Sequence, residues 1–405
     1  MKKPHIVILG AGYGGIMTTV KLQKSLKVED ASITLVNNHD YHYQTTWLHE
    51  NAAGTIHDEK TRIPIRDLIM NKKVSFIPDT VVSIHPEQKK IKLKENDCLY
   101  YDILVIGLGI EPAIPNIPGA EEYSLTVHDI NSARYLREHL EFNFASYQNE
   151  KEKDPGRLNI VLAGSGYPVI ELAGELANRI PELCKAYDVE KSLVRIINLE
   201  ESSHVFSQFD SQLAEYAMNS LTSRGIEFIT GVTPKECRED RIVYEKDHKT
   251  KHLLTRTIIC TDSVQASSVL EDVSAMNSNG KVDVQKDMRT MEHDNIFVLG
   301  SAAQVFSEGR QCSYPPTVRA TVQQSAVVAH NIKAILNNEE IIHFHPSFLG
   351  TATSLGHNDG ISEGTNGRKL FGWKAAFMKI MNENRYLLEL GGPSLLMKKG
   401  KFNFF

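Results

Sequence analysis

Short apolar runs, glycine turns and amphipathic stretches follow one another along much of the chain. Residues 5–26 (HIVILGAGYGGIMTTVKLQKSL) predict a strand, a tight turn and a helix, and residues 32–38 (SITLVNN) predict a second strand. Continuously apolar strands are typical of a parallel sheet that is buried on both faces. Residues 91–109 predict a hairpin arm followed by another buried strand, and residues 128–147 predict a helix.

The same order of strand, glycine turn and helix begins again in the middle of the chain. Residues 158–180 (LNIVLAGSGYPVIELAGELANRI) repeat it, and residues 193–202 supply the matching second strand. Residues 295–303 (NIFVLGSAA) again show an apolar run followed by a glycine, as in the first unit, and a long helix is predicted after Pro315 and Pro316. Two related units with a return to the first predict an α/β fold of two nested Rossmann-like dinucleotide-binding domains, followed by a C-terminal amphipathic helical region.

The first glycine turn, residues 10–15 (GAGYGG), fits G-x-G-x-x-G after a strand and at the start of a helix. The first glycine permits the tight turn, the second admits a pyrophosphate, and the third allows close packing of helix on strand. The helix N-terminus stabilises the phosphate charge. The second strand ends where an acid often holds the ribose, and an amide there binds a hydroxyl more weakly. The candidate residues are Gly10, Gly12, Gly14, Gly15, Asn37 and Asn38.

The second glycine turn has Gly164 and Gly166 but Val169 in place of the third glycine. The third position governs packing of helix on strand more than phosphate contact, so a larger side chain there would push the helix outward and narrow the site. Glu200 ends the matching strand, where a carboxylate accepts from both ribose hydroxyls and repels the 2′-phosphate of NADPH. The pattern favours an NADH site. The alternative is a decayed Rossmann-like unit that is kept only because it stabilises the fold.

Composition narrows the class of protein. The chain has 405 residues, of which 41% are hydrophobic and 23% charged, and its net charge of −5 argues against a nucleic-acid binder. The five cysteines are scattered, so neither a disulfide framework nor a Cys-based metal site is readable, and a reducing compartment fits best. No run reaches the ~18 apolar residues of a membrane-spanning helix, and the N-terminal run predicts a first strand rather than a signal peptide.

The C-terminal segment differs in charge from the rest. From Arg368 onward there are eight Lys and Arg residues against two Glu residues. Trp373, Phe377 and Ile380 or Met381 recur at helical spacing, which leaves lysines for another face. A basic amphipathic helix of this kind favours an anionic membrane surface, with core packing or a dimer contact as alternatives.

Four stretches make the chain resemble a known family: residues 41–56 (YHYQTTWLHENAAGTI), 101–109 (YDILVIGLG), 171–184 (ELAGELANRIPELC) and 373–379 (WKAAFMK). Together they resemble the bacterial type II NADH:quinone oxidoreductases, which are single-subunit, non-pumping flavoproteins of the pyridine nucleotide-disulfide oxidoreductase type. The resemblance implies FAD, NADH, a quinone of menaquinone or ubiquinone type, and peripheral attachment to the cytoplasmic face of the cell membrane, with a homodimer left open. It implies an FAD domain at 1–125 and 270–340, an NADH domain at 126–269, and a membrane-associating, flavin-capping region at 341–405.

The resemblance also implies roles for particular residues. Thr46, Gly109 and Gly300 would line the flavin with Ser301 at its ribityl chain, Val81 would meet the adenine, and Lys379 would reach the flavin from the tail. Glu171 would lie between the nicotinamide and quinone sites as a proton route. Val318 begins the stretch that matches a quinone-site pattern, in which the amides of Gln323 and Gln324 would face the quinone.

Three departures from the family pattern fall on the expected sites. Ser301 replaces an aspartate, Cys260–Ser263 replaces an Ala-Ala-Gly type of turn, and Arg319 replaces the first glutamine of the quinone pattern. A neutral hydrogen bond from Ser301 would be roughly half as strong as a charge-assisted one. We therefore expect FAD to be held more weakly than in relatives with the acid, and we keep a catalytically weakened accessory homologue as the alternative. The scattered cysteines argue against a disulfide reductase or a sulfide:quinone oxidoreductase.

Overall fold

The computed structural model of the chain divides into two compact units, which are considered separately. Unit 1 comprises Met1–Gln44, Arg62–Glu111 and Val264–Ser347, and unit 2 comprises Thr45–Thr61, Pro112–Ser263 and Phe348–Phe405. The structure describes residues 3–112, 116–164, 166–203, 205–206, 208–260, 264–277, 280–306, 317–347, 350–365 and 367–402. The predicted division by bound ligand into an FAD domain, an NADH domain and a C-terminal region stays a prediction.

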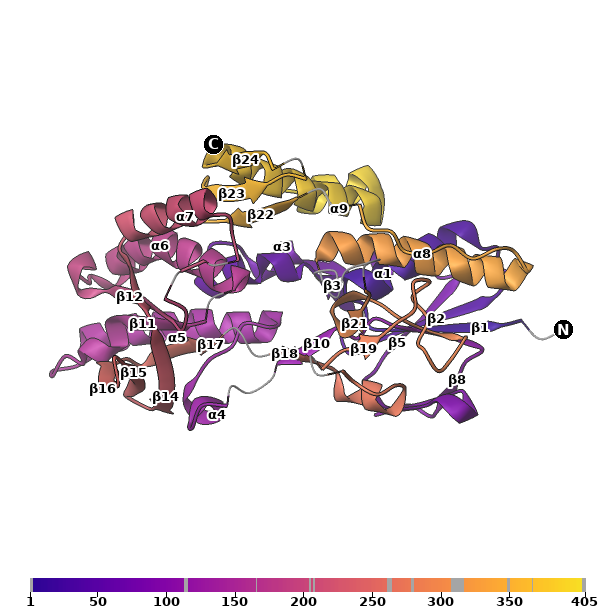
Figure 1. Cartoon of the computed structure of the whole chain (residues 1–405), viewed down its shortest axis with the longest axis horizontal. Helices are drawn as coiled ribbons and strands as arrows, with labels where there is room; N and C mark the ends of the chain where they lie inside the picture. Colours follow the sequence, from indigo (N-terminus) through magenta and orange to yellow (C-terminus); the bar gives the residue numbers. More distant parts are fainter. Residues whose placement is uncertain are drawn as a thin grey trace. The chain divides into compact units, whose positions relative to one another are not determined.

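Unit 1 is built on a parallel five-stranded sheet with the order β20-β9-β1-β2-β5 (Figure 1). The predicted first two strands are present, and their apolar residues are buried, as continuous apolar runs predict. The strands are β20 (Ile296–Val298), β9 (Ile103–Ile106), β1 (His5–Leu9), β2 (Ser32–Asn37) and β5 (Val74–Pro78).

Two helices of unit 1 pack along each other, α1 (Tyr13–Ser25) and α8 (Val318–Asn337). A glycine near the start of α1 permits this approach, because a Cβ on Gly14 would lie 2.5 Å from Leu299 Cδ1 and 3.2 Å from Thr321 Cγ2. The smaller sheets of unit 1 are formed by β6 (Val81–His85), β7 (Lys90–Leu93) and β8 (Leu99–Tyr100), by β3 (Tyr41–Tyr43) and β4 (Arg62–Pro64), by β19 (Val282–Asp283) and β21 (Ala303–Gln304), and by β10 (Ile110–Pro112) and β18 (Val264–Ala266).

Unit 2 repeats the parallel arrangement in a sheet with the order β13-β12-β11-β17. Its strands are β13 (Ile226–Thr230), β12 (Arg195–Glu200), β11 (Asn159–Ala163) and β17 (Thr257–Cys260). The helices of this unit are α2 (Leu48–Ala53), α3 (Asp58–Thr61), α4 (Ala120–Tyr123), α5 (Ile130–Asn149), α6 (Tyr167–Tyr187) and α7 (Ser211–Ser223). The predicted repeat of strand, glycine turn and helix is therefore present as β11 and α6.

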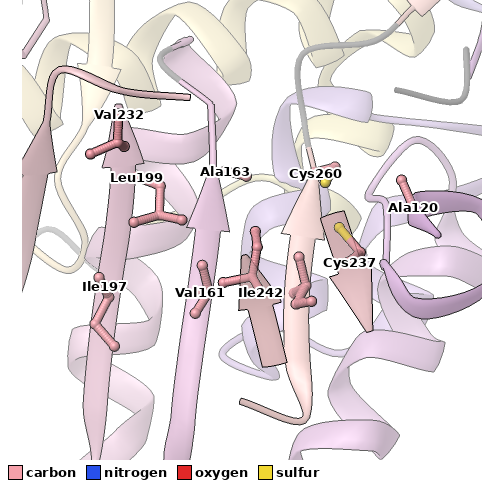
Figure 2. Close-up of a cluster of buried hydrophobic side chains, with 10 residues drawn as sticks. Ala120, Val161, Ala163, Ile197, Leu199, Val232, Cys237, Ile242 and Cys260 are labelled. Atoms are coloured by element: carbon pink, nitrogen blue, oxygen red, sulfur yellow. The ribbon is translucent and has the colours of Figure 1, made fainter. Parts of the chain in front are cut away.

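An antiparallel sheet packs against the parallel sheet of unit 2. It has the order β14-β15-β16, from β14 (Val232–Arg238), β15 (Arg241–Lys246) and β16 (Lys249–Leu254). The core between the two sheets is apolar and includes two thiols (Figure 2). Its buried members are Ala120, Val161, Ala163, Ile197, Leu199, Val232, Cys237, Ile242, Ile258 and Cys260.

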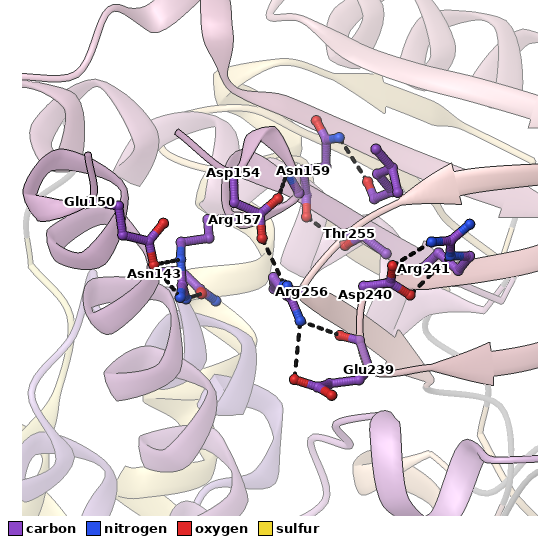
Figure 3. A network of polar contacts seen from close by, with 12 residues as sticks. Asn143, Glu150, Asp154, Arg157, Asn159, Glu239, Asp240, Arg241, Thr255 and Arg256 are labelled. Carbon is purple, nitrogen blue, oxygen red and sulfur yellow. Dashed lines mark hydrogen bonds and ion pairs between the residues drawn. The ribbon is translucent and has the colours of Figure 1, made fainter. Parts of the chain in front are cut away.

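A polar network fixes the beginning of β17 (Figure 3). The guanidinium of Arg256 donates to Asp154 at 2.8 Å and to Glu239 at 3.2 Å. The hydroxyl of Thr255 donates to the carbonyl of Asn159 at 2.6 Å, which ties the entry of β17 to the entry of β11. The strand that ends beside the second glycine turn is therefore anchored at its start by several directed bonds.

The C-terminal segment belongs to unit 2 and combines a small sheet with a long helix. The sheet has the order β22-β23-β24, from β22 (Thr351–Ser354), β23 (Gly360–Glu363) and β24 (Lys369–Phe371), and α9 spans Trp373–Lys399. α9 confirms the predicted helix, which is interrupted at Gly392, where φ is 72° and ψ is −169°. Within the described part of the chain, no helix is long and apolar enough to cross a membrane.

Candidate functional site

The three motif glycines of the first turn meet different steric limits. Gly10 has a φ of 87°, and a Cβ there would lie 2.4 Å from the carbonyl oxygen of Gly107. A Cβ on Gly15 would lie 1.9 Å from the carbonyl oxygen of Gly10, so helix and turn approach as the motif requires. A Cβ on Gly12 would make an ordinary van der Waals contact of 3.8 Å with the carbonyl oxygen of Gly107, so the protein itself tolerates a side chain at the N-terminus of α1. A pyrophosphate fits such a turn, because the first N–H groups of a helix have no partner within the helix.

Two side chains fix the backbone of Ala11, which lies inside this turn, through its N–H and its carbonyl. The N–H of Ala11 donates to Asn37 Oδ1 at 2.8 Å, and Nδ1 of His42 lies 2.8 Å from the carbonyl oxygen of Ala11. Burial lowers the pKa of His42 to about 4 and outweighs the opposing effect of that hydrogen bond, so the ring is neutral. Because a carbonyl only accepts, Nδ1 carries the hydrogen. The shape of the turn thus depends on a histidine that sequence reasoning missed.

The amide of Asn37 is already engaged at both ends. Its Oδ1 accepts from Ala11, and its Nδ2 donates to the carbonyl of His39 at 2.8 Å. Its neighbour Asn38 is exposed. The structure therefore supports a positioning role for Asn37 in the turn, and the ribose contact predicted for this pair stays a prediction.

Several predicted FAD residues follow strands of the unit 1 sheet at its carboxyl edge. Gly10 follows β1, Gly109 comes shortly after β9, and Gly300 comes shortly after β20. In open parallel sheets this edge is where ligands bind. Gly109 has a φ of 76°, and a Cβ there would meet nothing described within 4 Å. The N–H of Asp79 donates to the carbonyl of Asn37 at 2.9 Å, and Val81 begins β6 two residues later. The contact of Val81 with the adenine stays a prediction.

The paired glutamines of α8 contact backbone groups of unit 1. Gln324 is buried, and its Oε1 accepts from the N–H of Gly300 at 2.8 Å. Gln323 accepts from the N–H of Ser347 at 2.8 Å and donates to the carbonyl of the same residue at 3.1 Å. Gln324 therefore holds the turn that presents Ser301, which is half-buried. A quinone contact by either amide stays a prediction, as does the predicted role of Val318, the first residue of α8.

The second glycine turn lies in unit 2 between β11 and α6. Gly164 has a φ of 140°, and its carbonyl accepts from Asn198 Nδ2 at 2.9 Å. Gly166 caps α6, and Val169 is buried in the first turns of that helix. Glu200 is buried at the end of β12 and accepts from the N–H of Ser202 at 3.0 Å. These positions match the predicted NADH site, whose ligand contacts remain predictions, while Ser165 and the departure at Thr261–Ser263 lie outside the described residues.

A group of charged side chains lies inside unit 2 where α2, α6, α9 and the residues after α9 meet. Glu171 of α6 accepts from Lys379 Nζ at 2.5 Å and from the N–H of Ser354 at 3.1 Å. Its other oxygen lies 3.4 Å from Nδ1 of His49. The fold therefore brings together Glu171 and Lys379, two predicted site residues that are far apart in the sequence.

Lys401 continues the same group. Its ammonium pairs with the carboxylate of Glu50, lies 3.2 Å from Glu383 Oε2, and stands 4.2 Å from the centroid of the Trp47 ring. Glu383 is also 3.9 Å from Lys379, so it lies between the two lysines. We call this group the ionic cluster, and its members are His49, Glu50, Glu171, Lys379, Glu383 and Lys401.

Burial and charge act in opposite directions within the ionic cluster. Burial disfavours the charged form of both lysines, but their carboxylate neighbours outweigh it and raise the pKa of Lys379 and of Lys401. Burial lowers the pKa of His49 well below its usual value, and the positive charges of Lys379 and Lys401 lower it further. His49 is therefore neutral, and the lysines are firmly charged.

Glu175 lies one helical turn beyond Glu171 on α6 and has a different environment. It is buried, and its Oε2 accepts from the hydroxyl of Thr55 at 2.6 Å. Among the described residues no cation lies within ion-pair distance of it. Burial, and then the negative charge of Glu50, raise the pKa of Glu175 to about 7.

Comparisons with known proteins identify the family. The family model described as pyridine nucleotide-disulphide oxidoreductase matches residues 4–331. A protein named type II NADH:quinone oxidoreductase from Staphylococcus haemolyticus is 38% identical over 401 residues, which cover 99% of each chain. Its namesake from Staphylococcus aureus is 36% identical over the same length and coverage.

The chain belongs to the type II NADH:quinone oxidoreductase family. NDH2 from Plasmodium falciparum, solved in complex with NADH, has a TM-score of 0.86 at 16% identity, with 98% of both chains covered. The sulfide:quinone oxidoreductase of Aquifex aeolicus has a TM-score of 0.78 at 21% identity, covering 96% of this chain and 91% of that one. At these identities the solved structures show the fold alone. The predicted α/β fold and the resemblance to type II NADH:quinone oxidoreductases are thus confirmed.

Proposed function

We propose that this chain is an FAD-dependent oxidoreductase that transfers electrons from NADH to a membrane quinone without pumping protons. Family membership over the whole length of the chain supports this function, and the first glycine turn is the observation that carries it. The turn keeps the steric limits of a dinucleotide site at Gly10 and Gly15, and at Gly12 the protein itself does not exclude a side chain, as expected where a glycine serves ligand approach. FAD, when bound, supplies the two-electron chemistry that links a hydride donor to a quinone.

The residues of unit 1 fit an FAD in particular ways. The helix N-terminus after Gly12 would hold the diphosphate, and the open glycine at 109 would allow the ring system to approach the backbone. Gln324 holds the Gly300 turn, so the Ser301 hydroxyl would be positioned for the ribityl chain. Thr46 and Lys379 belong to unit 2, and their contribution to the flavin is proposed on the resemblance alone.

The donor is proposed to be NADH rather than NADPH. Glu200 ends the strand beside the second glycine turn, and a buried carboxylate there would repel a 2′-phosphate. Gly164 and Gly166 would let the diphosphate approach the start of α6.

Quinone reduction by NADH consumes one proton beyond the transferred hydride, and the ionic cluster suits that need. Lys379 donates to Glu171, whereas Glu175, one turn away on the same helix, has a pKa raised to about 7 by burial and by the charge of Glu50. A carboxyl with that pKa takes up and releases a proton near neutral pH. We assign Glu171 and Glu175 to the proton route.

The chain is proposed to lie on the cytoplasmic face of the membrane through α9. This helix exposes large apolar side chains on its surface, and lysines lie along the same segment. A charged and apolar helix of this kind binds an anionic interface without crossing it. The exposed residues are Trp373, Phe377, Met378, Met381, Leu388 and Met397. The acceptor is proposed to be a quinone of menaquinone or ubiquinone type, and sedimentation of the purified chain would test for a homodimer.

The test uses the full chain purified gently and without added flavin. We expect a yellow protein whose flavin absorbance is bleached by NADH without oxygen and restored by a water-soluble quinone. NADPH should act far more slowly, and a Glu200→Gln variant should narrow that difference. Glu171→Gln should lose quinone turnover while it still bleaches with NADH. Normal turnover in Glu171→Gln would contradict the assignment of that residue.

The alternative is an accessory homologue with little activity, and the departures at Ser301 and Arg319 favour it. It predicts a colourless protein that does not regain FAD when incubated with it. A protein that binds FAD but is not bleached by NADH would also support this alternative.

A further inference from the structure

Two buried thiols of unit 2 lie against each other, although their cysteines are far apart in sequence. Cys237 is inside β14 and Cys260 is the last residue of β17, with exposed fractions of 1% and 5%. Their side chains point toward one another across the core between the two sheets, and the thiols hydrogen-bond (Figure 2).

The backbones of both cysteines are fixed by one short segment of chain. The N–H of Cys237 donates to the carbonyl of Pro118 at 2.8 Å, and the N–H of Cys260 donates to the carbonyl of Leu125 at 2.9 Å. A Cβ on Gly119 in this segment would lie 2.1 Å from the carbonyl oxygen of Cys237. The contact between the sulfurs is therefore held by directed backbone bonds and close packing rather than by chance side-chain placement.

Access of a solvent oxidant to the two buried thiols depends on opening of the strand that ends in Cys260. β17 is an edge strand of its four-stranded sheet, and its entry is anchored by the network at Asp154 and Arg256. Among the described residues, only the single residue Leu125 pairs with its outer side near Cys260. Opening of its far end needs less free energy than global unfolding, because stability is not uniform along a structure. In the closed state the neighbouring thiol and burial raise the pKa of Cys237, and both side chains are buried, so peroxide reaches the thiols only when β17 opens.

We propose that Cys237 and Cys260 form a reversible disulfide when a peroxide reaches the opened end of β17. The Cys260 thiolate attacks one peroxide oxygen, which forms a sulfur–oxygen bond, breaks the oxygen–oxygen bond and releases water after protonation. The Cys237 sulfur then attacks the Cys260 sulfur, which forms the disulfide and releases a second water. The two thiols together lose two electrons and two protons, and one hydrogen peroxide becomes two waters.

The disulfide would alter the neighbouring nucleotide turn. Cys260 pairs in register with Ala163, the residue before Gly164. A disulfide draws the sulfurs to about 2.05 Å, well inside the separation of a thiol hydrogen bond, so the end of β17 must shift. This consequence rests on the proposed binding of NADH by unit 2. We expect oxidation to weaken NADH binding several-fold.

The experiment uses full-length flavin-loaded protein carrying Cys98→Ser, because Cys98 is exposed and would react first. After graded hydrogen peroxide, remaining thiols are alkylated under denaturing conditions, and non-reducing digestion with mass spectrometry identifies cross-linked peptides. We expect a Cys237–Cys260 peptide that dithiothreitol removes and that is absent in Cys237→Ala. Sulfinic acid at Cys260 without the cross-link, or both thiols unreacted at a dose that oxidises Cys98 in the parent protein, would overturn the proposal.

The effect on the nucleotide site is read separately, by NADH titration of the reduced and oxidised protein. An unchanged dissociation constant in protein shown to be cross-linked would refute the link to the turn. If the reduced protein binds no NADH at all, the proposed function fails, while the cross-linked peptide still decides whether the disulfide forms. Cys237→Ala treated with the same peroxide is the matched control, and it should keep its NADH affinity.

Discussion

The sharpest consequence of the ionic cluster concerns Glu175, whose replacement by glutamine should stabilise unit 2 at alkaline pH. Burial, and then the charge of Glu50, raise the pKa of Glu175 from 4.5 to about 7. The groups facing it are Glu50 from α2, Thr55 after α2, Lys379 from α9, Lys401 after α9 and Arg224 after α7.

The sign of the effect follows from which state holds the proton. Below pH 4.5 the carboxyl is protonated in both the folded and the unfolded chain. Between pH 4.5 and 7 the folded chain keeps a proton that the unfolded chain has lost, so the free energy of unfolding falls as pH rises. A pKa difference from 4.5 to about 7 corresponds to about 3 kcal/mol, all of it lost above pH 7. Glutamine is neutral at every pH and avoids that loss.

Tryptophan fluorescence is a suitable assay, because Trp47 and Trp373 both belong to unit 2. Urea unfolding at pH 5, 7 and 8.5 should give a wild-type stability that falls with pH. Glu175→Gln should lose most of that slope and exceed the wild type by up to about 3 kcal/mol at pH 8.5. Glu182→Gln, at an exposed site on the same helix, is the matched control and should follow the wild type. A Glu175→Gln variant with the wild-type slope, or one less stable at pH 8.5, would refute the reasoning.

Three further predictions test the same sites. Ser301→Asp should tighten FAD about fivefold, because a charge-assisted bond adds roughly 1 kcal/mol over a neutral one, and equilibrium dialysis of flavin would show it. Gly15→Ala should lose both FAD binding and thermal stability, because its Cβ would lie 1.9 Å from the carbonyl oxygen of Gly10. Gly12→Ala should weaken FAD binding but leave the thermal stability of the apoprotein unchanged. Lys401→Met should destabilise unit 2 by about 3 kcal/mol, because it leaves the buried Glu50 without its lysine and Glu383 with only the more distant Lys379. Lys398→Met at an exposed site should change the tryptophan-monitored stability by less than about 0.5 kcal/mol.

The parts of the fold that could be predicted from sequence are those with local signals. The runs ending at Leu9 and Ala163 are continuously apolar and precede glycines, and both became buried parallel strands followed by helices. The spacing of Trp373 and Phe377 predicted α9. Each of these features is decided by neighbours within one or two turns of chain, so periodicity and turn chemistry suffice.

The contacts that sequence reasoning missed join residues that are distant along the chain. His42 holds the first glycine turn through Ala11, yet in the sequence it is one ring in YHY with no periodic pattern. Gln324 is predicted to face a quinone, and sequence reasoning did not show that its Oε1 also accepts from the N–H of Gly300. A motif shows which residue types occur at a site, whereas the partner of each polar group depends on which buried backbone groups the fold leaves to be satisfied.

The ionic cluster shows the same limit and suggests why it is retained. Its members come from α2, α6, α9 and the residues after α9, so no single stretch of sequence reveals it. Replacing a buried ion pair with apolar residues is often neutral or stabilising, so stability alone gives no reason to keep so many charges inside unit 2. A cluster in which Glu171 pairs with Lys379, one turn from a Glu175 whose pKa is raised to about 7, fits the proposed proton route, because quinone reduction needs a proton. If Glu175→Gln stabilises the protein and slows only the quinone half of turnover, the cluster is retained for proton supply at a cost in stability.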